Sequence, residues 1–173
     1  LTVNITDNDN IDPGTAPFRY IAGATIKNLN VTGTVENTKG FHAAGLVGYA
    51  WKDTNTISNC VVSTTVNGGD YLGGLVGHGK GGSNGTETLI IENSAFIGTM
   101  NGGKYYTGGL LGWSDGSTLK ITNSIFDGTV TGYEPNCHFH PIAVRDNEKT
   151  MTTDIRIAIY TANPRKMDSG HNL

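Results

Sequence analysis

The chain has 173 residues, with 12 Lys and Arg against 15 Asp and Glu, so its formal net charge is −3. This length fits a single domain, and the absence of a basic surplus argues against a nucleic-acid-binding protein. No apolar run approaches the roughly 20 residues of a membrane-spanning helix, so we expect no membrane insertion of this segment.

Residues 1–6 alternate between apolar and polar side chains, which predicts a strand. The loop that follows carries Asp7, Asp9 and Asp12 and is similar to an acidic calcium loop, because oxygen ligands at alternate positions can surround a hard cation. The ligand spacing of an EF-hand is not kept, and a solvated polar turn is the alternative. The sequence leaves open whether residues 7–12 bind calcium.

The N-terminal part contains an incomplete first repeat, which we assign to residues 1–25. Residues 18–23 lie just before Ile26, at the position where a Gly-Leu-x-Gly sequence precedes the later repeats. The chain begins without Met and without a signal-peptide profile. We therefore expect a fragment or a mature domain of a longer protein, with other domains of the same chain as partners.

Residues 26–132 hold the repeats. The phrase Gly-Leu-Val-Gly at Gly45–Gly48 returns at Gly74–Gly77 and, with a second Leu, at Gly109–Gly112. A second phrase, Ile-x-Asn, begins at residues that lie 31, 34 and 30 positions apart: Ile26, Ile57, Ile91 and Ile121. Self-similarity at such a period indicates stacked supersecondary units, each of which buries its apolar face against its neighbours.

Within each unit the positions five, seven and nine after the anchor Ile are apolar or small, which is typical of a strand. In the second unit we expect Ile57, Val62, Val66, Leu75 and Val76 in the core. A bend near the Asn explains why the alternation shifts after the Ile. Stacked in register, the four Asn would form a dry ladder whose amides bond the turn backbone: Asn28, Asn59, Asn93 and Asn123.

These phrases resemble GLUG-motif repeats, and the resemblance covers roughly residues 17–145. Such repeats occur in bacterial surface proteins, adhesin-like proteins and the non-catalytic parts of IgA-cleaving peptidases. The resemblance implies an all-β fold, a right-handed β-helix-like solenoid of about four to five irregular rungs with a period of 30–34 residues. It also implies an extracellular or cell-surface location.

Residues 133–173 depart from the pattern and are interpreted as a C-terminal cap with exit strands, since terminal repeats are often atypical. Residues 138–144 replace the expected glycine block, and Ile155–Tyr160 alternates as one more strand. Cys137, His138 and His140 could ligate a transition metal, but their spacing is not that of a usual zinc site. We assign no metal, no cofactor and no catalytic residue.

Aromatic residues recur beside the glycine blocks. His42, Tyr71 and Tyr106 stand three positions before them, and Tyr49, His78 and Trp113 directly after, with Trp51 nearby. Rings in a row suit sugar rings, whose apolar faces pack on them. The candidate ligand contacts are Tyr71, Tyr106, Trp113, Tyr49 and Trp51. The alternative is a ladder of stacked rings that only closes the corners.

The preferred function is a non-catalytic structural or adhesive module that binds a glycan or a host or cell-surface protein. The alternative is a β-helix carbohydrate-active enzyme, a polysaccharide lyase or hydrolase, which needs converging carboxylates. The acids of the repeats fall at different columns, mostly in turns: Glu36, Asp53, Asp70, Glu87, Glu92, Asp115 and Asp127. Their positions therefore predict no pair of carboxylates that face each other as a catalytic pair would.

Overall fold

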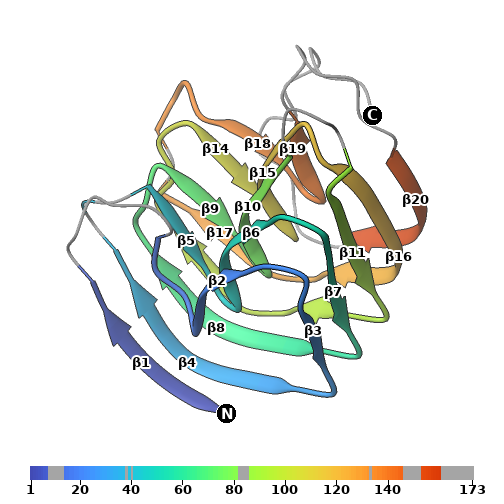
Figure 1. The fold of residues 1–173 in the computed structure, drawn as a ribbon. Coiled ribbons are helices and arrows are strands. Elements are labelled where there is room, and N and C mark those ends of the chain that lie inside the picture. Colours follow the sequence, from blue (N-terminus) through green and yellow to red (C-terminus); the bar gives the residue numbers. More distant parts are fainter. Residues whose placement is uncertain are drawn as a thin grey trace.

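The computed structural model describes residues 1–7, 14–37, 39, 41–81, 86–132 and 134–145, together with the backbone of 153–160. Every element in the described part is a β-strand, and all the strand pairs are parallel. The chain winds through three sheets in succession and repeats the circuit for about four turns, which confirms the predicted β-solenoid (Figure 1).

The strands of each sheet come from successive turns. The large sheet contains β1 (Thr2–Thr6), β3 (Thr25–Lys27), β4 (Asn30–Glu36), β7 (Thr54–Ser58), β8 (Val61–Asn67), β11 (Thr88–Glu92), β12 (Ala95–Phe96), β13 (Thr99–Asn101), β16 (Thr118–Phe126), β17 (Thr129–Thr131) and β20 (Thr153–Tyr160). The five-stranded sheet contains β2 (Phe18–Ile21), β6 (Val47–Trp51), β10 (Val76–Lys80), β15 (Leu111–Asp115) and β19 (Ala143–Arg145). The four-stranded sheet contains β5 (His42–Ala44), β9 (Tyr71–Gly73), β14 (Tyr106–Gly108) and β18 (His138–His140).

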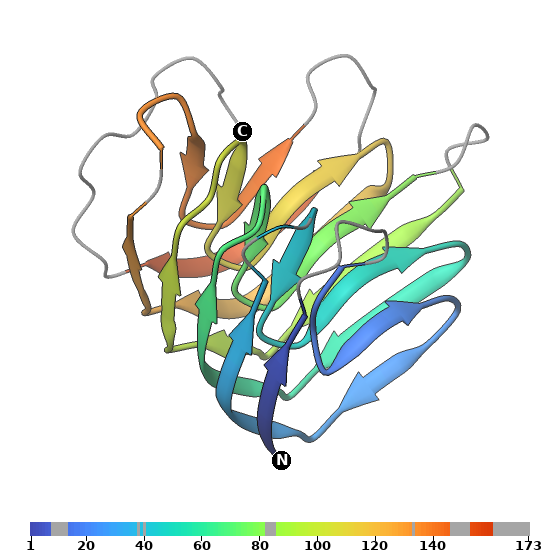
Figure 2. The ribbon, with the colours of Figure 1, turned by 90° about the vertical axis from the view of Figure 1, so that its left-hand side faces the viewer.

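The anchor isoleucines form one inward column, as predicted. Ile26 pairs with Ile57, which pairs with Ile91, which pairs with Ile121. The last three have no exposed surface, and Ile26 is 8% exposed at the first turn. The register continues to Ile155 in β20, so the strand predicted near the C-terminus is also confirmed. β1 and β20 lie at opposite ends of the stack (Figure 2).

The glycine blocks are explained by close packing between turns. A Cβ on Gly74 would lie 2.1 Å from the Gly109 carbonyl oxygen, and one on Gly45 would lie 2.5 Å from the Gly74 oxygen. No side chain fits at the first position of the block. The Leu that follows is fully buried in each of three turns: Leu46, Leu75 and Leu110.

The prediction of a dry Asn ladder is wrong. The four Asn side chains are exposed, although they do bond one another across turns, Asn59 Nδ2 to Asn28 Oδ1 and Asn123 Nδ2 to Asn93 Oδ1, each at 3.3 Å. Their shared property is a left-handed backbone, with φ between 48° and 57°. Asn is one of the few residues that tolerate this conformation, and it makes the bend.

The side chain that satisfies the bend belongs to the next residue. Ser94 Oγ accepts the Cys60 backbone N–H at 3.1 Å, and Ser124 Oγ accepts the Ser94 N–H at 3.2 Å. Cys60, Ser94 and Ser124 are all buried. This column of small side chains links three successive turns.

The chain beyond residue 133 continues the circuit. β18 pairs with β14, and β19 pairs with β15, so these residues add strands to both smaller sheets in the positions of the earlier repeats. At the other end β2 pairs with β6, where the sequence placed a degenerate block.

Val66→Asp should lower the free energy of unfolding by more than about 4 kcal/mol, because it places an unpaired carboxylate in the core. Val66 is fully buried, between Val35 and Met100 in neighbouring turns. The matched control is Val61→Asp on the same strand, where Val61 is 38% exposed. Chemical denaturation that gives both variants the same midpoint would contradict the assignment of the inward face.

Asn93→Ala should lower the free energy of unfolding by about 1–2 kcal/mol, the cost of a left-handed backbone for a residue that has a Cβ but lacks the short polar side chain of Asn. Asn93→Gly should cost less, because glycine adopts this conformation freely. Both variants lose the same exposed hydrogen bond from Asn123, so the difference between their denaturation midpoints isolates the backbone contribution. Equal midpoints would assign the effect to the amide.

Candidate ligand-binding surface

Two columns of rings run across the turns on the two smaller sheets. On the four-stranded sheet His42, Tyr71, Tyr106 and His138 are register partners in succession. On the five-stranded sheet the succession is Tyr20, Tyr49, His78 and Trp113. We call these eight residues the aromatic strip.

The two columns meet ring to ring across the glycine block. The Trp113 ring stacks on Tyr71 at 5.0 Å between centroids and on His78 at 4.2 Å, with interplanar angles of 17° and 20°. His42 lies 5.5 Å from Tyr49 and 4.7 Å from His78. The residues before and after each block therefore interlock, so the strip is one continuous network of stacked, tilted and edge-to-face ring contacts.

The centre of the strip is closed to solvent. His42 and His78 are each 2% exposed, and Tyr49 is 9% exposed, so these rings cannot contact a large ligand. Trp113 is half-buried and its indole Nε1 has no hydrogen-bond partner in the described part of the chain. Of the candidate contacts, Tyr49 and Trp113 are therefore parts of the ladder.

One group of accessible rings flanks the strip. Phe41 and Tyr105 are 37% and 44% exposed and lie on either side of the half-buried Tyr71, with centroids 6.3 Å and 5.9 Å from it. We call these three residues the Tyr71 platform. Neither Phe41 nor Tyr105 was singled out from the sequence, although each directly precedes a ring of the column in the chain.

A second group of accessible rings lies on the edge strand β2. Phe18 and Tyr20 are 36% and 42% exposed. Tyr20 meets the half-buried Trp51 edge to face at 6.5 Å, and Lys52 Nζ lies 4.9 Å from the centre of the Trp51 ring. The candidate Trp51 therefore belongs to this edge group, while Tyr106 stacks between Tyr71 and His138 within the strip.

Charged groups border the Tyr71 platform. Burial raises the pKa of the Asp70 carboxyl, Lys104 opposes this shift, and Glu134 adds to it. Lys104 Nζ lies 5.0 Å from the centre of the Tyr105 ring, and its hydrogen bond with the Tyr105 side chain raises the pKa of Lys104. The platform thus combines aromatic rings with a carboxyl group and an ammonium group beside them.

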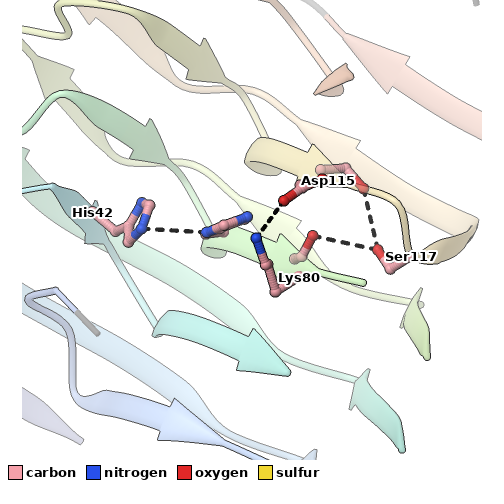
Figure 3. A network of polar contacts seen from close by, with 7 residues as sticks. His42, Lys80, Asp115 and Ser117 are labelled. Atoms are coloured by element: carbon pink, nitrogen blue, oxygen red, sulfur yellow. Dashed lines mark hydrogen bonds and ion pairs between the residues drawn. The ribbon is translucent and has the colours of Figure 1, made fainter. Parts of the chain in front are cut away.

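Polar contacts within the strip and near it join successive turns (Figure 3). His42 Nε2 and His78 Nδ1 are 3.3 Å apart, so one imidazole donates to the other. Lys80 Nζ pairs with Asp115 Oδ2 at 2.6 Å, and the Asp115 side chain is only 4% exposed. Asp115 was expected among the turn acids, but it lies at the end of β15 and links two turns through Lys80.

The other residues considered for chemistry have structural partners. Cys137 Sγ lies 3.3 Å from Thr107 Oγ1. His140 Nδ1 accepts the backbone N–H groups of Ile142 and Ala143, and burial lowers the pKa of His140. Among the described residues no group of three His, Cys, Asp or Glu could hold a metal ion.

The predicted acidic loop is described only at its start. Asp7 pairs with Arg19 at 3.2 Å. Asp9 and Asp12 lie outside the described residues, so the calcium question is not addressed by the structure.

Part of the chain is similar to Halomucin from Haloquadratum walsbyi, with 35% identity over 117 residues. The match covers 63% of this chain and 1% of that protein, so the chain spans a very small part of the length of the curated relative. No family model matches the chain, and no solved structure matches it at a significant level. Within the described residues, no helix has the length and apolar character to cross a membrane.

Trp113→Ala should lower the free energy of unfolding by about 3–5 kcal/mol, the usual cost of truncating a large aromatic side chain in a core. Trp113 contacts rings of both columns, so its removal opens the stack. Tyr105→Ala is the matched control, because Tyr105 is 44% exposed and should change stability little. Thermal or denaturant melts that rank the two variants in the opposite order would show that Trp113 is not a packing residue.

Proposed function

We propose that this chain is a non-catalytic adhesive repeat module that binds a glycan through the Tyr71 platform. The observation that carries the proposal is the exposure of Phe41 and Tyr105 beside Tyr71, on top of a ring stack that fixes their positions. Clusters of exposed aromatic side chains held on a rigid support are typical of recognition surfaces.

The geometry of the platform suits a carbohydrate. Three rings succeed one another at intervals of 6.3 Å and 5.9 Å. The Phe41 and Tyr71 planes are stacked within 9° of parallel, so a sugar would pack its apolar face on the solvent-exposed parts of Phe41 and Tyr105. The Asp70 carboxyl and the Lys104 ammonium group lie beside the rings and could bond sugar hydroxyls. Because the rings are stacked on buried neighbours, little conformational entropy is lost when a ligand binds.

A location outside the cell is part of this proposal. It is supported by the resemblance of the Gly-Leu-Val-Gly and Ile-x-Asn phrases to GLUG-motif repeats and by the partial match to Halomucin. Haloquadratum walsbyi is an archaeon, so a bacterial source is supported by the GLUG resemblance alone.

Tyr105→Ala should weaken glycan binding by about tenfold, which corresponds to about 1.4 kcal/mol. The isolated chain would be applied to a glycan array, and the affinity for the bound glycan measured by calorimetry. Val61→Ala is the control, because Val61 is a similarly exposed apolar residue on the large sheet. An array without bound glycans, or a Tyr105→Ala variant with unchanged affinity, would contradict the proposal. Retention of a purified surface protein that is lost in Tyr105→Ala would assign the platform to protein adhesion.

The enzyme alternative is favoured by one observation. Asp70 directly precedes Tyr71, its pKa is raised, and Glu134 is close enough to contribute to the shift. A carboxyl with a raised pKa near a second carboxylate is a feature of glycoside hydrolases. Turnover of a polysaccharide that is abolished in Asp70→Asn would establish this alternative. Binding without turnover in the wild type would support the adhesive module.

A further inference from the structure

Two N-x-Thr sequences lie on the outer face of the large sheet. Asn4-Ile5-Thr6 is in β1, and Asn30-Val31-Thr32 begins β4. This sequence is the acceptor for N-linked glycans when the middle residue is not Pro. The Asn side chains of both sites are outside the core and the ligand-binding surface described above, and Thr32 Oγ1 lies 3.2 Å from Thr2 Oγ1 on the neighbouring strand.

The strand alternation presents both acceptor amides to solvent. In each site the Asn and the Thr are exposed, while the side chain between them faces inward. Val31 is fully buried, and Ile5 packs against the core. An oligosaccharide on either Asn would therefore project away from the solenoid without disturbing the stack.

Side-chain hydrogen bonding distinguishes most of the other described asparagines from Asn4 and Asn30. Eight described Asn hydrogen-bond through their side chains: Asn28, Asn37, Asn55, Asn59, Asn67, Asn93, Asn101 and Asn123. The Asn4 and Asn30 amides make no such bond within the described part of the chain. Asn136 shares this property but has His138 two positions later and so lacks the acceptor sequence. Asn84 is followed by Thr86 but lies outside the described residues.

We propose that Asn4 and Asn30 are N-glycosylation sites, an inference that rests on the proposed location outside the cell. The donor would be an oligosaccharide linked to a lipid phosphate or pyrophosphate. A bond forms between the side-chain Nδ2 and the anomeric carbon of the sugar, and the bond from that carbon to the lipid phosphate oxygen breaks. The amide loses one proton, the lipid phosphate leaves, and nothing is oxidised or reduced.

The two sites lie on neighbouring strands of the large sheet, because β1 pairs with β4. The Tyr71 platform is built from the four-stranded sheet and the residues beside it, so oligosaccharides on β1 and β4 would leave the platform accessible.

The test is mass spectrometry of the intact protein and its peptides, recovered from the extracellular or surface fraction of the organism that makes it. Asn4→Gln and Asn30→Gln should each remove the mass of one oligosaccharide. Thr32→Ala should have the same effect as Asn30→Gln, whereas Thr32→Ser, which keeps the acceptor sequence, should not. Asn136→Gln is the control and should leave the glycan mass unchanged. The melting temperature of each variant establishes that it is folded.

Exported protein in which both Asn4 and Asn30 are unmodified would overturn this inference and leave the proposed function intact. A glycan mass that persists on the peptides containing residues 4 and 30 in the Asn4→Gln, Asn30→Gln double variant would also overturn it. Protein confined to the cytosol would overturn both the glycosylation and the proposed location.

Discussion

Parallel, in-register hydrogen bonding between successive turns is the constraint on which the rest of this structure depends. Each strand bonds to the equivalent strand of the next turn, so equivalent residues lie on top of one another along the stack. Ile57 contacts Ile91, and Phe96 stacks on Phe126 with centroids 6.0 Å apart. Each residue is thus packed mainly against the equivalent residues of the two neighbouring turns. A substitution in one turn therefore alters the packing in the turns on both sides of it.

The glycine blocks add a second constraint, because they bring two sheets close enough for their rings to interlock. The resulting aromatic strip is both a structural element and the base of a surface. Its buried members, such as His42 and His78, stabilise the stack, while Phe41 and Tyr105 at its margin remain accessible. A ligand would meet rings whose orientation is already fixed, which is how a small number of exposed side chains can provide useful affinity.

Two surfaces of the solenoid then differ in chemistry. The smaller sheets carry rings with charged residues beside them, whereas the outer face of the large sheet carries Thr, Ser and Asn side chains in columns such as Thr34, Thr65, Thr99 and Thr129. The proposed carbohydrate-binding platform lies on the first surface, and the proposed N-linked glycans lie on the second. This separation allows the module to be modified without blocking the surface that recognises a partner.

The repeat phrases alone determined the period, the stacking and the inward Ile column, because in-register stacking follows from sequence identity at a fixed spacing. They also determined that the rings beside the glycine blocks would align. Only the tertiary structure decided which polar side chains are buried. The left-handed backbone at Asn93 turns its side chain outward and places Ser94 inside, and this reversal depends on φ, not on polarity. The accessible rings depend on how the two smaller sheets meet, and the Lys80–Asp115 pair depends on the burial of Asp115 beside its register partner in the five-stranded sheet.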